Sequence, residues 1–307
     1  MLSTFPEFTR LTFENREDYE RLIKDYPPFS DISFVTLQIW WNLENQLSVA
    51  LLNNNLVIHY YLPFDAENSG YTLVGKEKLE ESANTIFDYL RHEHQPVKLV
   101  HVPEFVVSQM THNGAMAFDE EVDYNEYILD AHGLASLEDP SHGRTRRKVN
   151  RFKREVEERN VEIKELDLSN EDVQNELFEA VIAWEQKQSS ANDPDHTEHQ
   201  AIKRTLSNAK HLDIRHIGLY IDEKLYAIVL YHQPEGSDHF VLHHLKVDYS
   251  IPYIFDYMTH HIADKAVKED VNFLNMEMDL GIERLRQHKM GLRPVDFFRK
   301  YTISPTA

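Results

Sequence analysis

The order of the expected elements constrains the fold of this chain most, because the same order occurs twice along its 307 residues. Hydrophobic periodicity in the first half predicts two helices, a three-stranded meander, a helix and a strand, at 14–25, 30–41, 47–74, 76–92 and 97–102. A short helix and a strand then run to about residue 118. The chain is also longer than one average domain, so a repeated domain accounts for both observations.

The second half predicts the same succession of elements, with no detectable repetition of individual residues. Its two helices, meander, helix, strand, short helix and last strand are expected at 171–188, 198–209, 214–247, 252–268, 271–279, 282–288 and 297–303. We therefore predict an α+β protein with two tandem domains, 1–125 and 126–307. Each is expected to have a mixed, mostly antiparallel sheet flanked by helices.

The net charge limits the partners that the whole surface attracts. The chain has 52 acidic and 32 basic residues, a formal charge of −20, and no cysteine. Such a surface repels nucleic acid and anionic lipid, so contact with either must rest on a local basic patch. The lack of cysteine excludes disulfides, thiolate metal sites and a cysteine nucleophile. With no long apolar run and no signal-peptide pattern, we predict a cytoplasmic protein without a transmembrane segment.

A basic patch of this kind occurs at residues 144–154, where seven cations stand without an acid. At helical spacing most of them share one stripe, opposite Val149, Phe152 and Val156. One interpretation is a solvated helix face neutralised by the glutamates that follow. The other is a phosphate site, because the arginine fork matches phosphate oxygens. The candidate phosphate ligands are Arg146, Arg147, Lys148 and Arg151.

Polar residues also alternate along the expected strand at 271–279. Asn275, Glu277 and Asp279 would leave one face of this strand, and two carboxylates this close raise one pKa toward that of a general base. Alternatively, Asp279 caps the next helix and Glu277 pairs with an arginine. Arg286 and Lys289 follow closely, either neutralising these acids or holding the phosphates of a donor.

Other familiar chemistries find little support in the sequence. The paired histidines, such as His243-His244, would face opposite sides of a strand, so no metal site is predicted. The motifs G-x-S-x-G, G-x-x-x-x-G-K-[ST] and G-x-G-x-x-G are absent, which removes the usual signals for serine hydrolases, P-loop enzymes and Rossmann domains.

Three segments carry a resemblance to a known family. Residues 275–289 resemble N-x-E-x-D-L-G-I-x-x-L-R-x-x-K, a signature of the soluble proteins grouped with the phosphatidylglycerol lysyltransferase C-terminal domain. Pro294 and Lys300-Tyr301 continue this likeness. Residues 30–34 with Ile39-Trp40 resemble the S-D-x-S-F…I-W segment of the same family, and residues 146–152 resemble its R-x-x-I-N-R-F helix. The order of elements is also that of the GNAT acyltransferase fold.

This resemblance implies two GNAT-like domains and a relationship to enzymes that transfer an aminoacyl group from tRNA to a lipid or, in the similar Fem-type proteins, to a peptidoglycan peptide. The chain departs from GNAT acetyltransferases at residues 248–251, which lack the Q/R-x-x-G-x-G/A loop that wraps the pyrophosphate of coenzyme A. Acyl-CoA is therefore disfavoured, and no cofactor is predicted.

Residue pattern and resemblance together predict an acyltransferase. It would move an aminoacyl group from aminoacyl-tRNA, or another phosphate-bearing donor, to an amine or hydroxyl of a lipid, peptide or small molecule. Glu277 would be the base and Asn275 would orient a substrate, while Arg146, Lys148 and Arg151 bind donor phosphates and Arg286 with Lys289 neutralise charge near the reacting carbonyl.

The alternative is a non-catalytic protein that binds a small ligand or peptide on the same scaffold. A catalytic cleft is expected to leave Glu277 accessible to solvent, whereas a structural network would bury it against an arginine. Contact with a membrane surface is disfavoured by the net charge.

Overall fold

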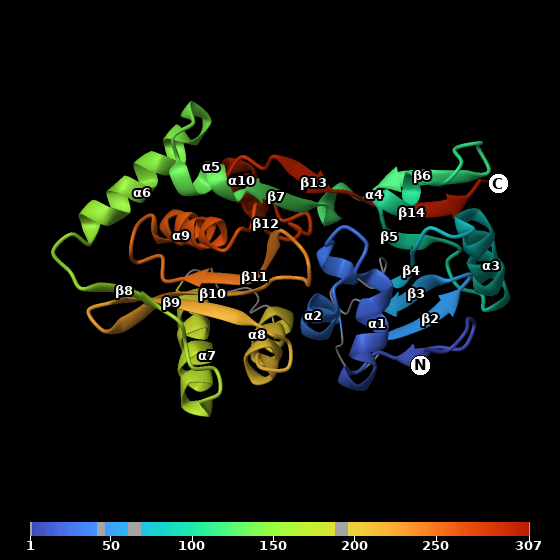
Figure 1. Cartoon of the computed structure of the whole chain (residues 1–307), viewed down its shortest axis with the longest axis horizontal. Coiled ribbons are helices and arrows are strands. Elements are labelled where there is room, and N and C mark those ends of the chain that lie inside the picture. Colours follow the sequence, from blue (N-terminus) through green and yellow to red (C-terminus); the bar gives the residue numbers. More distant parts are fainter. Residues whose placement is uncertain (1, 42–46, 61–68, 188–195, 307) are drawn as a thin grey trace. The chain divides into compact units, whose positions relative to one another are not determined.

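The computed structural model describes residues 2–41, 47–60, 69–187 and 196–306, which form two compact units (Figure 1). The first unit comprises Met1–Glu126, Met278–Glu283 and Phe297–Ala307, and the second comprises Tyr127–Glu277 and Arg284–Asp296. One seven-stranded mixed sheet belongs mainly to each unit. The α+β architecture with two GNAT-like sheets is thus confirmed.

The sheet of the first unit has the order β1-β2-β3-β4-β5-β14-β6. Its strands are β1 (Thr9–Arg10), β2 (Ser48–Leu52), β3 (Asn55–Tyr60), β4 (Gly70–Val74), β5 (Leu99–Pro103), β6 (Met116–Glu120) and β14 (Lys300–Pro305). β2 and β3 form the predicted hairpin, whose turn residues Asn53 and Asn54 have φ of 50° and 61°. Asparagine tolerates this left-handed conformation, so the turn follows from the local sequence.

The helices of the first unit are short except for α3. They are α1 (Arg16–Ile23), α2 (Phe34–Thr36), α3 (Leu79–His92) and α4 (Glu104–Val107). α3 buries Ala83, Ile86, Phe87 and Leu90 in one hydrophobic core with residues of the sheet, as their spacing predicts. The single helix predicted at 30–41 is wrong: a 3₁₀ turn, α2 and a π-helical turn occupy this segment, because Ser33 is extended (φ −71°, ψ 131°).

The sheet of the second unit has the order β13-β7-β12-β11-β10-β9-β8. Its strands are β7 (Glu126–Asp130), β8 (Val161–Lys164), β9 (Arg215–Ile221), β10 (Lys224–His232), β11 (His239–Val247), β12 (Phe273–Asn275) and β13 (Asp296–Phe298). β8 to β11 form antiparallel pairs, whereas β11 and β12 are parallel. The parallel pair requires a crossover, and α9 provides it.

Helices cover both faces of this second sheet. They are α5 (Ala131–Ser136), α6 (Gly143–Glu155), α7 (Glu171–Gln186), α8 (His196–Asn208), α9 (Ile254–Lys268) and α10 (Glu283–Gly291). α9 lies over one face of β10 and β11, and α7 and α8 lie on the other (Figure 1). Among the described residues, no helix is long and apolar enough to cross a membrane.

The C-terminal strand differs from the expected continuous second domain at 126–307. β14 pairs with β5 and β6 of the first sheet, and Ile303 is fully buried in the core of the first unit. A strand of this length carries no sequence signal for its partner, since its apolar residues fit the buried position in either sheet.

Candidate functional site

The candidate site begins where the parallel strands β11 and β12 stop pairing. They pair from His239 to Val241 and from Phe273 to Asn275, after which β12 ends and β11 continues. β11 has a β-bulge at this point, because Leu230 of β10 lies opposite His244 while Tyr231 lies opposite Leu242. The extra residue is His243. Bulges redirect side chains beside functional sites, and the carboxyl ends of parallel strands are where ligands bind in open α/β sheets.

The predicted strand at 271–279 is wrong beyond Asn275. The side-chain oxygen Asn275 Oδ1 accepts the backbone N–H of Glu277 at 2.8 Å, and Glu277 has φ of 56°, in the left-handed region. The chain therefore turns, and Asn275, Glu277 and Asp279 do not alternate on one strand. Asp279 makes an Asx turn instead, with Oδ1 accepting the N–H of Gly281 at 2.8 Å before α10 begins.

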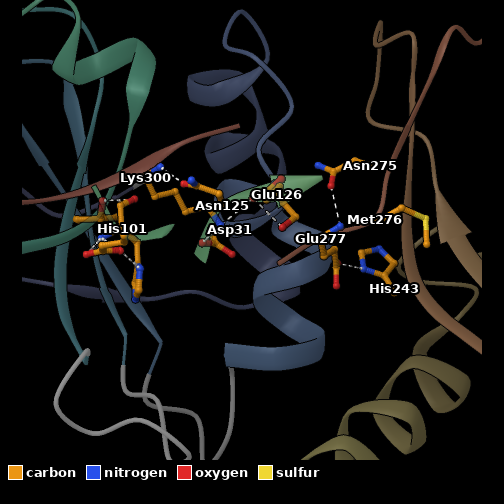
Figure 2. A network of polar contacts seen from close by, with 12 residues as sticks. Asp31, His101, Asn125, Glu126, His243, Asn275, Met276, Glu277 and Lys300 are labelled. Atoms are coloured by element: carbon orange, nitrogen blue, oxygen red, sulfur yellow. Dashed lines mark hydrogen bonds and ion pairs between the residues drawn. The ribbon is translucent and has the colours of Figure 1, made fainter. Parts of the chain in front are cut away.

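Glu277 pairs with a histidine. Its Oε1 lies 2.8 Å from His243 Nδ1 (Figure 2), and His243 Nε2 lies 2.7 Å from His232 Nδ1. The side chain of His243 is fully buried, and that of Glu277 is 12% exposed. Burial lowers the pKa of His243 to about 3, so its ring is neutral near pH 7. Both histidines were missed as site residues, because a β-bulge and a cross-strand contact leave no pattern in the sequence.

Lys289 anchors the chain beyond β12 rather than displaying its charge to solvent. Its ammonium donates to the carbonyl oxygens of Met276 at 2.7 Å and Glu277 at 3.2 Å, and the residue is only 6% exposed. The ring of Tyr127 lies beneath it, with 5.6 Å between Nζ and the ring centroid. Arg286, on the same helix α10, is half-buried.

The basic stripe on α6 has the predicted orientation. Val149, Phe152 and Val156 are buried, and the cations are on the exposed or half-buried side. Several cations are engaged locally: Arg146 donates to the carbonyl of Leu137 at 3.1 Å, Lys148 to Asp256 at 2.7 Å and Arg151 to the hydroxyl of Tyr253 at 2.9 Å. Arg147 is exposed.

A cavity of about 210 Å³ brings cations of α6 and α10 together beside α9. The residues of interest in its wall are Arg144, Lys148, Asp256, Arg284, Gln287 and His288. Of the six predicted phosphate ligands, only Lys148 lines it. Arg144 and Arg284 make no hydrogen bond or ion pair with any residue that the structure describes. The sequence showed both basic clusters, but their meeting depends on the packing of two helices far apart in the chain.

One helix links this cavity to Glu277. His288 of α10 lines the cavity, and the next residue, Lys289, binds the carbonyl of Glu277. Burial lowers the pKa of His288, so its ring adds a neutral polar group to the wall. Three cations and one acid face the same space, which favours an anionic ligand.

A second buried polar cluster lies within the first unit. Lys300 Nζ contacts Asp31 Oδ2 and lies 2.9 Å from Glu126 Oε1, and Glu126 also accepts the N–H and hydroxyl of Ser30 (Figure 2). Burial raises the pKa of Asp31 although Lys300 opposes this shift. Ser30-Asp31 and Lys300 belong to segments that carried the family resemblance, so these segments meet in one ion cluster.

The histidine doublet on β11 has the expected geometry. His243 faces Glu277, whereas His244 Nε2 lies 3.0 Å from the hydroxyl of Thr205 on α8, on the other side of the sheet. Within the described ranges, no group of three or more histidine, aspartate or glutamate residues is placed to hold a metal ion.

Comparison with known proteins identifies the family. The family described as "Phosphatidylglycerol lysyltransferase, C-terminal" matches residues 54–304. The chain belongs to this family. The predicted resemblance is therefore confirmed, and the signature residues lie where the two polar clusters form. A search of curated proteins finds no match.

Solved structures show the same fold as this family member. A conserved protein of unknown function from Bacteroides thetaiotaomicron superposes with a TM-score of 0.82 at 20% identity, covering 97% of this chain and 99% of the other. The C-terminal domain of a putative lysylphosphatidylglycerol synthetase from Agrobacterium fabrum gives 0.63 at 14% identity, covering 96% and 92%. The L-PGS of Bacillus licheniformis gives 0.59 at 14% identity, covering 99% and 94%. Family and fold together are those of an acyltransferase of the lysyltransferase or GNAT type.

Proposed function

We propose that this protein transfers an aminoacyl group from aminoacyl-tRNA to an amine or hydroxyl acceptor. The observation that carries the proposal is the cavity between α6 and α10, where the guanidinium groups of Arg144 and Arg284 have no protein partner among the described residues. Two arginine forks beside a lysine match the charge and geometry of phosphate oxygens. Membership of a lysyltransferase family supports a donor of this kind.

Glu277 is the proposed general base. The acceptor amine or hydroxyl gives its proton to this carboxylate while it attacks the ester carbonyl of the donor. The pairing of Asn275 with the N–H of Glu277, and of Lys289 with its carbonyl, holds the base in position. In this proposal Asn275 and Lys289 thus act on Glu277, and Asp279 shapes the turn into α10.

The charges of α6 extend the proposed donor surface. Arg147 and Arg151 are exposed beside the cavity-lining residues of the same helix and would meet phosphates further along a tRNA. Acyl-CoA is the competing donor, and the loop before α9 is used internally, since Asp248 accepts the N–H of Ser250 at 2.9 Å. The cytoplasmic location predicted from the sequence agrees with a tRNA substrate and stays a prediction.

Binding measurements test the donor site. Fluorescence anisotropy would compare an aminoacyl-tRNA pool, uncharged tRNA and coenzyme A at two salt concentrations. Replacing both arginines, Arg144→Ala with Arg284→Ala, is expected to weaken tRNA binding by about tenfold or more and to flatten its salt dependence by about two phosphate contacts. The matched control removes two other cations of α6, Lys153→Ala with Arg154→Ala. Equal loss in both double variants would contradict a specific site at the cavity.

The competing hypothesis is a ligand-binding protein without catalysis. It keeps the cavity but gives Glu277 a structural role, in line with the pairing of this carboxylate to His243 and its low exposure. It predicts that the protein binds an anionic ligand and leaves the aminoacyl ester intact.

A further inference from the structure

Glu277 is the outer member of a chain of three side chains in the second unit. His243 Nδ1 lies 2.8 Å from Glu277 Oε1, and His232 Nδ1 lies 2.7 Å from His243 Nε2. The two imidazole rings stack nearly parallel, at 9° and 4.8 Å between centroids. His232 is 4% and His243 5% exposed, so the chain leads from the partly exposed carboxylate into the protein.

The hydrogen bonds of this chain run in one direction. An ionised carboxylate only accepts, so the proton between Glu277 and His243 sits on Nδ1 of the histidine. The His243 ring is neutral near pH 7, because burial lowers its pKa to about 3, and it carries no second N–H. Its Nε2 is therefore an acceptor, and the proton between the two rings sits on His232 Nδ1.

The backbone fixes both ends of the bond between Glu277 and His243. The β-bulge in β11 sets the direction of the His243 side chain. On the other side, Asn275 and Lys289 hold the N–H and carbonyl of Glu277 in its left-handed conformation. A non-glycine residue held in this conformation costs about 1–2 kcal/mol and persists where the surroundings determine it, which is common at functional sites.

We propose that His243 and His232 are positioning residues for Glu277, and that their one-way chain makes this single carboxyl both collect and return the proton of the transfer reaction. The proposal rests on the role of Glu277 as general base. Because Oε1 already accepts the His243 proton, the proton from the acceptor goes to Oε2. It does not pass inward, because His243 Nε2 already receives a proton from His232.

The chemical step balances on this arrangement. The N–H or O–H bond of the acceptor breaks, a bond from hydrogen to Glu277 Oε2 forms, and the electron pair released forms the bond from the acceptor to the ester carbonyl carbon. When the ester C–O bond then breaks, its electron pair stays on the ribose oxygen of the donor. That oxygen takes the proton back from Oε2, which restores the carboxylate.

The direction of the chain is tested by nitrogen NMR of the histidine rings, which needs no substrate. In protein labelled with ¹⁵N-histidine at pH 7, both rings are expected to carry their proton on Nδ1 with respect to this chain, and His243 to have an unprotonated Nε2. In Glu277→Leu the His243 ring loses its acceptor, and its proton is expected to move to Nε2. A His243 ring in the wild type that is protonated on Nε2, or on both nitrogens, would overturn the proposal.

Kinetics test the positioning role. His243→Leu is expected to lower the single-turnover rate of aminoacyl transfer by about tenfold or more with unchanged tRNA affinity, and His243→Asn to recover part of this loss, because its amide also donates to Glu277. His244→Leu is the control, since it removes a buried histidine that faces the other side of β11. A His243→Leu protein with the wild-type rate overturns the role. A wild type that transfers nothing while the NMR signature holds refutes the proposed function and not the chain.

Discussion

At the scale of single residues, the neutral imidazole beside Glu277 distinguishes this site from an ordinary ion pair. An arginine or lysine partner would stabilise the carboxylate strongly and weaken it as a base. His243 is held neutral by burial, so it supplies a hydrogen bond without a full charge. This arrangement keeps the carboxylate oriented while preserving more of its basicity.

The buried histidine also predicts how stability depends on pH. The unfolded-state pKa of histidine is about 6.5, whereas that of His243 in the folded protein is about 3. Between pH 6.5 and 3 the unfolded chain therefore binds the extra proton, and folding loses stability as the pH falls. From pH 7 to pH 5 this contribution amounts to about 2 kcal/mol.

Urea unfolding at pH 7 and pH 5 measures this effect. The wild type is expected to lose about 2 kcal/mol more free energy of unfolding over this interval than His243→Asn, which has no ring to titrate. Comparing the two proteins removes the contribution of His244, whose pKa is also lowered by burial. An identical pH dependence of both proteins would mean that His243 is accessible to protons in the folded state.

At the scale of secondary-structure elements, most helices and strands follow from local pattern, and the site does not. The Asn53-Asn54 turn and the buried face of α6 were readable because turn chemistry and helical periodicity are local properties. The end of β12 was not readable, because it depends on a hydrogen bond from Glu277 to Asn275 and on Lys289 thirteen positions after Met276. Alternating polar residues looked the same as a continuing strand.

The ion cluster of the first unit joins three elements and supports a prediction on stability. Lys300 begins β14, Glu126 begins β7 and Asp31 lies in the 3₁₀ turn before α2. Lys300→Met removes the only cation paired with both carboxylates in this cluster, and leaving buried acids uncompensated costs about 3–5 kcal/mol. Denaturant unfolding measures this loss.

Two controls make the Lys300 result specific. The triple variant Lys300→Met, Asp31→Asn, Glu126→Gln removes the buried charges together and is expected to regain much of the stability. Lys268→Met breaks an exposed pair with Asp264 on α9 and is expected to cost less than about 1 kcal/mol. A loss in Lys300→Met no larger than in Lys268→Met would show that the cluster is not a structural requirement.

At the scale of the whole molecule, a net charge of −20 and a tRNA donor are compatible only through local asymmetry. The basic run on α6 and the arginine of α10 concentrate positive charge around one cavity of the second unit. Such a local field attracts a polyanion while the remaining surface disfavours nonspecific contact. Sequence reasoning recovered the two clusters and the repeated element order, whereas the cavity required residues about 140 positions apart to meet.

The two units also show why chain order alone does not define them. The chain passes between them after Glu126, Glu277, Glu283 and Asp296. The short segment Met278–Glu283 and the C-terminal strand return to the first unit, so the family signature at 275–289 contributes residues to both. A duplication of sequential domains predicts neither exchange, because strand pairing is decided by packing.

The central claim is that Glu277 catalyses aminoacyl transfer from tRNA, and single-turnover transfer tests it most directly. Protein in excess is mixed with a pool of aminoacyl-tRNA carrying labelled amino acids, together with phosphatidylglycerol vesicles, peptides or small amines as acceptors. The wild type is expected to move label from tRNA to one acceptor class. Glu277→Gln is expected to do so about 10²–10⁴-fold more slowly with unchanged tRNA affinity. Equal rates for the two proteins, or label that leaves tRNA no faster than without protein for every acceptor, would contradict the account.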